Sequence, residues 1–441
     1  MASRSVLPRA GGGSNVDRWF QLKSQVHTRL LNTLSPDQLR SLGKDGMKES
    51  IANSVEKLIA DTGTPMTISE REKLIEEILD EVFGLGPLET LLKDPTISDI
   101  MVNGFDSVYV ERAGIMQETS VRFKDGPHVR MIIDRIVSNI GRRIDESSPI
   151  VDARLPDGSR VCAVIPPISL IGPVMSIRRF GKKLLSNDDL IRNETFTPGM
   201  LEFLNACVKA RLNVIISGGS GSGKTTLLNT LSRFIPETER VVTIEDTAEL
   251  QLQQEHLVRL ETRPENIEGA GEISQRDLVI NALRMRPDRI VIGECRGPEA
   301  LDMMQAMNTG HDGSMTTCHA NTARDAFSRL ETMVMMASSS IPDRVIRQML
   351  ASAVQVVIQI SRLTDGSRKI VSISEVTEIS DDQVLLEDIF RFERTGVGRN
   401  GRALGSFRAT GARPVNAGRM KAYGVKVNDA IFEEVHEIAD K

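Results

Sequence analysis

The stretch NVIISGGSGSGKTTLLNTLSRF, residues 213–234, decides the fold of this chain of 441 residues. Its centre, Gly218 to Thr225, matches the pattern GxxxxGK[ST]. The run NVIIS before it is apolar like a buried strand, and KTTLLNTLSRF after it has helical character. A strand, a glycine-rich turn and a helix in this order predict a phosphate-binding loop. The alternative, a flexible Gly-Ser turn, does not account for the two flanking elements.

The chemistry of a phosphate-binding loop explains each residue type in the pattern. Glycines let successive backbone N–H groups converge on phosphate oxygens, and the helix start adds partial positive charge. The Lys224 side chain reaches the β and γ phosphates, and the Thr225 hydroxyl is a ligand of Mg²⁺. We therefore predict a nucleotide site formed by Gly218, Gly219, Ser220, Gly221, Ser222, Gly223, Lys224, Thr225 and Thr226.

Two further strand-like runs end in carboxylates. ERVVTIED, residues 239–246, ends in Glu245 and Asp246, and RIVIGE, residues 289–294, ends in Glu294. In a P-loop protein such an acid holds the hydration shell of Mg²⁺ or polarises the attacking water. An acid at a strand end is otherwise often a solvated cap, and the P-loop upstream favours the catalytic interpretation. Helical patterns lie between these runs, so the pattern is typical of a parallel sheet buried on both faces.

Hydrolysis of a nucleotide also needs positive charge near the γ-phosphate, which an arginine often supplies. One group of candidates lies in QRDLVINALRMRPD, residues 275–288, and a second lies just before a polar linker, where a cleft between domains would form. Surface arginines on solvated faces are the alternative for both groups. The candidates are Arg276, Arg284 and Arg286 in the first group and Arg178 and Arg179 in the second.

The segment GHDGSMTTCH, residues 310–319, gathers two of the six histidines. Its spacing does not match a zinc pattern, and adjacent residues such as Cys318 and His319 point to opposite sides of a strand. We predict a hydrogen-bonding element near the nucleotide, with His319 as a sensor of the γ-phosphate. A purely structural turn is the alternative.

Composition limits the class of protein. Lys and Arg total 55 and Asp and Glu total 60, giving a formal charge of -5, so no overall positive field favours nucleic acid. Aromatic residues make up 4% of the chain, and the four cysteines form no CxxC pair, which fits a reducing compartment. The sequence shows no long apolar run. We expect a cytoplasmic protein whose membrane contact is made through a partner.

The chain length predicts several domains. A Gly-rich lead-in and a tail rich in Gly and Arg flank the ordered part, and we expect the tail to be loosely ordered. Helical periodicity before Gly84, Gly86 and Pro87 predicts a bundle that serves packing or docking. The predicted parts are a lead-in at 1–16, a helical bundle at 17–92, a small α/β domain at 93–185, a P-loop domain at 186–393 that follows a polar linker at 181–189, and a tail at 394–441.

Together these elements resemble the secretion-system traffic ATPases, the family that powers type II secretion, type IV pili and type IV secretion. The resemblance rests on the P-loop, VVTIEDTAEL at 241–250, Gly293-Glu294 and GHDGSMTTCHANT at 310–322. More narrowly, the chain is similar to the tight-adherence (Flp pilus) branch, the CpaF/TadA assembly ATPases. The absence of the four-cysteine zinc insertion found in many other members favours that branch. The segments that carry this narrower similarity are ISDIMVNG, VYVERAG, RIDESSPIVDARLPDGSRV, PVMSIRRF and ALRMRPDRIVIGECRG.

The resemblance covers roughly residues 50 to 390 and implies an α/β fold with a RecA-like C-terminal domain after a small, PAS-like N-terminal domain. It implies that the P-loop binds ATP and Mg²⁺, that Glu245 positions or deprotonates the attacking water, that Glu294 supports Mg²⁺ through water, and that His319 senses the γ-phosphate. It also implies hexameric rings in which arginines of both domains reach the nucleotide. The matching arginines are Arg178, Arg179, Arg276 and Arg286.

The function that this resemblance predicts is a cytoplasmic ATPase that assembles, and could also retract, a Flp-type pilus through inner-membrane platform proteins. Two alternatives remain at this point. One is a type IV secretion ATPase that moves DNA or protein effectors, against which the acidic net charge argues weakly. The other is a nucleotide-gated scaffold with little hydrolysis, against which the presence of both Glu245 and Glu294 argues.

Overall fold

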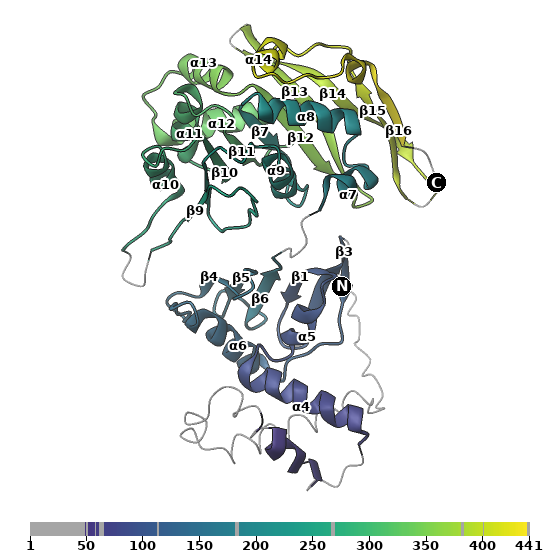
Figure 1. Ribbon diagram of the computed structural model, residues 1–441. Helices are drawn as coiled ribbons and strands as arrows, with labels where there is room; N and C mark the ends of the chain where they lie inside the picture. Colours follow the sequence, from purple (N-terminus) through teal and green to yellow (C-terminus); the bar gives the residue numbers. More distant parts are fainter. Residues whose placement is uncertain are drawn as a thin grey trace, which may run out of the picture. The chain divides into compact units, whose positions relative to one another are not determined.

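The structure is a computed structural model, and it describes residues 49, 52–57, 59–60, 66–112, 114–180, 185–265, 270–380, 383–399 and 401–438. The chain divides into two compact units, with the boundary between Phe180 and Gly181 (Figure 1). The fold class agrees with the prediction: both units are mixed α/β, and each has its own sheet. Among the described residues, no helix combines the length and apolar character needed to cross a membrane.

The first unit begins with helix α4, Ile68–Phe83, and its boundaries follow from local sequence. Thr67 and Glu70 form a reciprocal capping box at its start, and the helix ends where Gly84 takes an extended conformation. Leu74 and Ile78 pack with Val55 and Ile59 in a small core. Most of the predicted bundle at 17–92 lies outside the described residues. Helix α5, Leu88–Lys93, packs into the core of the following sheet instead.

The sheet of the first unit is antiparallel and has six strands in the order β3-β2-β1-β6-β5-β4. Alternate residues such as Ile100 and Val102 point into one core, where they meet Ile132 and Ile136 of helix α6, Gly126–Ser138. This is the small α/β domain that the sequence predicts. The strands are β1 Ile97–Val102, β2 Val108–Arg112, β3 Ile115–Glu118, β4 Ile150–Arg154, β5 Arg160–Val164 and β6 Val174–Arg178.

The second unit is built on a ten-stranded sheet in the order β16-β15-β14-β13-β12-β7-β11-β10-β8-β9. The six strands from β12 to β9 are parallel, so their carboxyl ends lie on one side of the domain and their amino ends on the other. The parallel strands are β7 Val214–Ser217, β8 Val241–Glu245, β9 Leu257–Glu261, β10 Arg289–Cys295, β11 Met315–Cys318 and β12 Val356–Arg362.

Helices cover both faces of this parallel sheet (Figure 1). Alternate residues of β7 face two different cores: Val214 and Ile216 pack with helices α8 and α9, whereas Ile215 packs with helices α10 to α13. This burial on both faces is the reason that the strands are continuous apolar runs, as the sequence predicts. The helices are α7 Asn187–Arg192, α8 Pro198–Lys209, α9 Lys224–Ser232, α10 Gln275–Ala282, α11 Glu299–Asn308, α12 Ala323–Ala337 and α13 Asp343–Ala353.

The prediction of a loosely ordered tail from Arg394 is wrong. This part of the chain extends the sheet by antiparallel pairing, and a few well-placed aromatics hold it: Phe392 and Phe407 are 4.9 Å apart between ring centroids, and Phe432 packs on Phe203 of α8. The low apolar content of this segment was misleading, because a strand at the edge of a sheet needs only one apolar face. The elements are β13 Arg368–Ser380, β14 Gln383–Val397, β15 Ala403–Ala409, α14 Ala417–Ala422, the 3₁₀ turn η1 Asp429–Glu433 and β16 Val435–Ile438.

The predicted linker at 181–189 is shorter than expected. Ser186 and Asp189 form a capping box that starts α7 at Asn187, so the polar residues of this stretch are helix-capping residues. Residues 181–184 of the predicted linker lie outside the described residues.

Candidate functional site

The glycine-rich loop joins β7 to α9, as the sequence predicts. Gly221 and Gly223 have φ angles of 66° and 101°, in the left-handed region that favours glycine. A side chain at Gly218 would lie 2.4 Å from the Ile360 carbonyl oxygen, so this position has no room for one. The loop therefore has the backbone shape that directs N–H groups into a shared cradle at the start of a helix.

The Lys224 side chain folds back over the loop. Its ammonium group donates hydrogen bonds to the carbonyls of Gly218 at 3.0 Å and Gly219 at 3.1 Å, and it lies 3.6 Å from a Glu294 carboxylate oxygen. Burial lowers the pKa of Lys224, and the Glu294 carboxylate opposes that shift. The lysine is thus held in the position from which a P-loop lysine contacts phosphate oxygens.

Glu294 is the acid nearest to the loop. It lies on β10, where Gln275 donates a hydrogen bond to its backbone carbonyl at 3.0 Å. Its carboxylate also forms an ion pair with Arg296 at 2.5 Å, and Arg296 reaches Asp246 at 3.6 Å. Arg296 was not predicted as a site residue, although it stands two residues after Glu294. Three charged groups, Lys224, Glu294 and Arg296, therefore meet at the carboxyl ends of the strands.

Glu245 ends β8 beside this cluster and is 3% exposed. One carboxylate oxygen, Oε2, accepts hydrogen bonds from the backbone N–H groups of Glu249 at 2.7 Å and Leu250 at 2.8 Å. The other, Oε1, is buried and has no hydrogen-bond partner within the described parts of the chain. Burial raises the pKa of Glu245, and the two backbone hydrogen bonds oppose this. A buried carboxylate with one open oxygen can act as a general base toward a water molecule.

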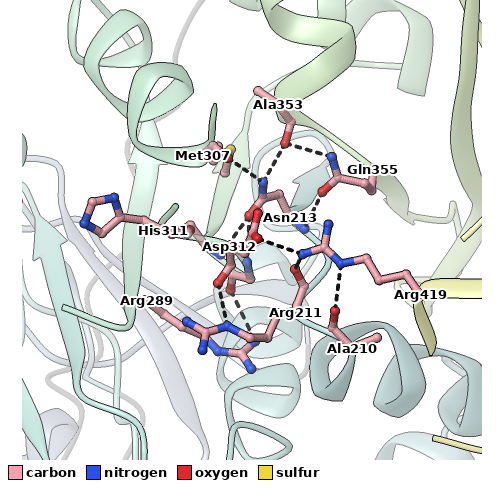
Figure 2. A network of polar contacts seen from close by, with 12 residues as sticks. Ala210, Arg211, Asn213, Arg289, Met307, His311, Asp312, Ala353, Gln355 and Arg419 are labelled. Atoms are coloured by element: carbon pink, nitrogen blue, oxygen red, sulfur yellow. Dashed lines mark hydrogen bonds and ion pairs between the residues drawn. The ribbon is translucent and has the colours of Figure 1, made fainter. Parts of the chain in front are cut away.

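The histidine-rich segment spans the sheet from one side to the other. His319 follows β11 and is exposed, and the backbone N–H of Gly218 donates to the Cys318 carbonyl at 3.3 Å. His319 thus lies next to the start of the glycine-rich loop. Gly313 and Ser314 lie at the amino ends of the strands, where their N–H groups donate to the Asn213 side chain at 2.8 and 3.0 Å. Figure 2 shows this separate network around Asn213, Arg289 and Arg419.

The fold separates the candidate arginines of the P-loop domain. Arg276 lies at the start of α10, on the same side as Glu294, and forms an ion pair with Asp302 at 2.7 Å. Arg284 and Arg286 are exposed and precede the amino end of β10, on the side opposite the P-loop. The fold therefore brings Arg276 toward the P-loop of its own chain and leaves Arg284 and Arg286 away from it.

The two arginines of the first unit differ from each other. Arg178 ends β6 with an exposed side chain. Arg179 donates from its guanidinium to the backbone carbonyls of Leu91 at 3.4 Å and Asp94 at 2.5 Å, which fastens it to the end of α5. The Arg178 side chain is therefore open to solvent, whereas the Arg179 side chain is held within its own unit.

Three further groups of residues at the site were not predicted from the sequence. Thr317 of β11 donates to the Gly293 carbonyl at 2.8 Å, directly before Glu294. Gln359 of β12 is buried beside Ser217, its partner in the β7 register, and donates to the Asn321 carbonyl at 2.9 Å. Arg362 and Arg368 flank the glycine-rich loop from a neighbouring hairpin. Only the last pair had a visible signal, since the turn sequence TDGS separates the two arginines.

Comparisons with known proteins identify the family. The family model of "Type II/IV secretion system protein" matches residues 81–429. A putative conjugal transfer protein of Mycobacterium tuberculosis is 35% identical over 333 residues, which is 70% of this chain and 94% of that protein. The type IV secretion system protein VirB11 of Bartonella quintana is 31% identical over 342 residues, covering 69% of this chain and 94% of that protein.

Among solved structures, the VirB11 ATPase of the Brucella suis type IV secretion system, in complex with sulphate, matches 67% of this chain and 97% of its own, with 29% identity and a TM-score of 0.37. The matched range of the family model and the coverage of the relatives define the class as the type II/IV secretion system proteins, and the chain belongs to this family. The predicted family is thereby confirmed, whereas its tight-adherence branch stays a prediction.

Proposed function

We propose that the chain is an ATP hydrolase that powers the transfer of macromolecules through a type IV secretion apparatus. The observation that carries the hydrolase is the contact of Lys224 in the glycine-rich loop with Glu294, while Glu245 lies beside Gly293, the residue before Glu294. The transfer function is supported by the printed names of the relatives, which are conjugal transfer and type IV secretion proteins. This was the alternative in the sequence analysis, and it takes precedence here over pilus assembly.

The residues at the loop fit an Mg²⁺ ion together with ATP as substrate. The Thr225 hydroxyl and the Glu294 carboxylate are hard oxygen donors, the type that Mg²⁺ prefers, and water completes the coordination. When bound, the ion neutralises charge on the phosphate oxygens. Lys224 contacts the β and γ phosphates, Glu245 positions or deprotonates the attacking water through its open oxygen, and His319 lies where it can sense the γ-phosphate.

Turnover of ATP by the purified full-length chain tests this assignment. Lys224→Ala removes the charge that contacts the phosphates, and we expect it to lower turnover by at least about 100-fold. The matched control is Lys209→Ala, since Lys209 is an exposed lysine on α8. Equal turnover in Lys224→Ala and wild type would overturn the assignment of the site.

A single-turnover measurement separates the two glutamates. Glu245→Gln should keep nucleotide binding but lose the chemical step by about 100-fold or more, because it removes the proposed base. Glu294→Gln should raise the Mg²⁺ concentration needed for half-maximal rate. If both variants hydrolyse ATP at the wild-type rate while still binding it, the chain is a nucleotide-gated scaffold.

We further propose that the chain works as a ring, with six copies as the expected number. Arg284 and Arg286 lie on the side of the sheet away from their own P-loop, so they can approach phosphate only in another copy. Imaging of the Glu245→Gln variant with ATP tests this arrangement. Monodisperse monomers under those conditions would exclude it.

A second candidate function is assembly of a Flp-type pilus through inner-membrane platform proteins. It is favoured by the tight-adherence-like segments, of which residues 143–161 form the β4–β5 hairpin of the first unit. The two functions separate in a cell that carries Lys224→Ala at the native locus. Loss of macromolecule transfer with intact pili supports the first, and loss of pili with intact transfer supports the second.

A further inference from the structure

The hairpin formed by β12 and β13 lies against the glycine-rich loop. Its two arginines, Arg362 at the end of β12 and Arg368 at the start of β13, are partners in the antiparallel register. Arg368 donates a hydrogen bond from Nε to the Gly221 carbonyl at 3.0 Å, and its Cδ lies 3.3 Å from where a methyl group on Gly223 would be. Arg362 Nη1 lies 3.5 Å from the corresponding position on Gly221. Both arginines therefore border the part of the loop expected to hold phosphate.

The hydrogen bond to Gly221 fixes the orientation of one peptide group of the loop. The C=O and N–H of a trans peptide point in opposite directions. Since the Gly221 carbonyl points to Arg368, the N–H of Ser222 must point away from Arg368. It donates a long hydrogen bond of 3.4 Å to the Gly219 carbonyl. A phosphate oxygen bound in the loop can replace this weak acceptor, so Arg368 sets the direction in which the Ser222 N–H is offered.

Two arginines directly opposite each other on neighbouring strands are unfavourable, because like charges repel across the pair. Both side chains bring positive charge to the edge of the glycine-rich loop. The glycine-rich loop beside the two arginines is the place where the proposed substrate carries its phosphates. The positive charge of the two arginines is therefore complementary to the negative charge of these phosphates.

The hairpin is fastened at several points, so its arginines are held in place. Asp365 in the turn accepts the backbone N–H of Ala403 at 2.7 Å, and Arg394 of β14 donates to Thr364 at 3.1 Å. Lys369, next to Arg368, is 2% exposed and pairs with Glu194 at 3.4 Å. The position of Arg368 is thus set before any ligand binds, which is the condition for a positioning role.

We infer that Arg368 is a positioning residue for nucleotide phosphate: it orients the Ser222 N–H through the Gly221 carbonyl, and Arg362 opposite it adds positive charge to the same phosphates. This inference rests on the proposed function, since it assumes that the loop binds a nucleotide. It extends the site beyond the residues of the P-loop motif to a hairpin more than 130 residues further along the chain.

Binding of ADP and ATP with Mg²⁺ to the full-length chain tests the inference. Arg368→Gln removes the Nε–H donor and the charge, and we expect nucleotide affinity and the KM for ATP to weaken by about tenfold, with a smaller change in kcat. Arg368→Lys keeps a donor that can reach the carbonyl and should recover most of the affinity. Arg362→Gln removes the positive charge of this side chain and should weaken affinity by about threefold, with a reduced salt dependence of binding.

The control is Arg391→Gln, which changes an exposed arginine of β14 that pairs with Asp388 at 2.9 Å and leaves the Gly221 carbonyl bonded. It should bind nucleotide as wild type does. Equal affinity of Arg368→Gln and wild type, with Lys224→Ala impaired, overturns this inference and leaves the proposed function standing. A wild-type chain that binds no nucleotide overturns the proposed function, and this inference with it. Thermal unfolding of the ligand-free Arg368→Gln variant shows whether the substitution destabilises the fold. If the loss of nucleotide affinity were only structural, Arg368→Lys would lose as much affinity as Arg368→Gln.

Discussion

The two sides of the parallel sheet differ in how their buried polar groups are satisfied. At the amino ends, the Asn213 side chain makes hydrogen bonds to Ala353 at 2.7 Å, Gly313 at 2.8 Å and Ser314 at 3.0 Å. At the carboxyl ends, buried side-chain oxygens of Ser217, Glu245 and Gln359 have no hydrogen-bond partner within the described residues. At the amino ends, His311 Nδ1 is also unpaired among the described residues. Buried polar groups are usually paired, so three unpaired oxygens at the carboxyl ends of the strands indicate a site where a ligand or water completes the bonding.

The same strands therefore serve two purposes. Their amino ends hold the domain together, and their carboxyl ends leave groups available for chemistry, as is general for open parallel sheets. Replacements at the amino ends should therefore reduce the free energy of unfolding without a specific effect on nucleotide binding. Replacements at the carboxyl ends should have the opposite pattern.

The largest effect is expected at Arg289, which is fully buried and ion-paired with Glu239. It also donates to the Val208 carbonyl at 2.8 Å. Arg289→Met leaves the Glu239 carboxylate without its main partner, and we expect a loss of about 3–5 kcal/mol in the free energy of unfolding, measured in urea.

The matched control for Arg289→Met is the double variant Arg289→Met, Glu239→Leu. It removes both charges, so it should recover a large part of the lost stability. If the single and double variants unfold at the same urea concentration, the loss comes from packing and the ion pair does not explain it.

Much of the fold was predictable from the sequence because apolar runs and glycines record local requirements. The strands β7, β8 and β10 and helices α9 and α10 were all predicted from periodicity. Arg289 shows the limit of this approach: a single arginine at a strand start gives no signal of burial. It is buried because Gly313, with φ of 82°, leaves space that a side chain there would fill, 2.6 Å from Arg289 Nη1.

The next effect is expected at Asn213, which is 1% exposed. Asn213→Ala removes an acceptor for two backbone N–H groups and a donor to the Ala353 carbonyl, leaving buried groups unpaired. We expect a loss of about 3 kcal/mol in the free energy of unfolding. Asn308→Ala is the control, because Asn308 is an exposed asparagine of the adjacent α11 that donates to Met349 at 3.0 Å, and it should cost less than about 1 kcal/mol. Similar losses in both variants would contradict the special role of the buried network.

The candidate site was predicted as far as its motifs extend. Lys224 and Glu294, both picked out from motifs, lie 3.6 Å apart. The turn sequence between Arg362 and Arg368 indicated a hairpin but not its place beside the loop, and Thr317 and Gln359 gave no signal, because strand order decides which distant segments border the loop. That order places β11 and β12 on either side of β7, although β7 lies about 100 and 140 residues earlier in the chain.

A gain in stability is expected at Glu245. Burial raises the pKa of Glu245 above its usual 4.5, so the folded state disfavours the ionised carboxylate. Glutamine can place its oxygen where Oε2 accepts two N–H groups and its NH₂ where Oε1 has no donor facing it. Glu245→Gln should therefore raise the free energy of unfolding at pH 7 by about 0.5–2 kcal/mol while activity falls.

The stability gained in Glu245→Gln should depend on pH, and the direction follows from the raised pKa of Glu245. A carboxyl group whose pKa is raised in the folded state stabilises the fold below pH 4.5, and that stability is lost as pH rises through the folded pKa. The advantage of Glu245→Gln over wild type should therefore shrink below pH 4.5. Glu375→Gln is the control: burial also raises its pKa, but both of its oxygens accept hydrogen bonds, from Val415 at 2.6 Å and Asn416 at 2.9 Å. Its NH₂ would face a donor, so this variant should lose stability. A loss in Glu245→Gln as well would remove the contrast between the two sites.

The smallest effect is expected at Thr317, whose hydroxyl forms a hydrogen bond next to Glu294. The register of β10 and β11 is interrupted between Ile292 and Cys295, so Gly293 and Glu294 lie outside the regular ladder, and the Thr317 hydroxyl holds the Gly293 carbonyl at 2.8 Å. Thr317→Val keeps the shape and removes this bond, so we expect a loss of about 1 kcal/mol in stability and a severalfold lower kcat with unchanged nucleotide affinity. Thr317→Ser retains the hydroxyl and should restore kcat. Equal kcat in Thr317→Val and wild type would mean that Glu294 is positioned without this hydrogen bond.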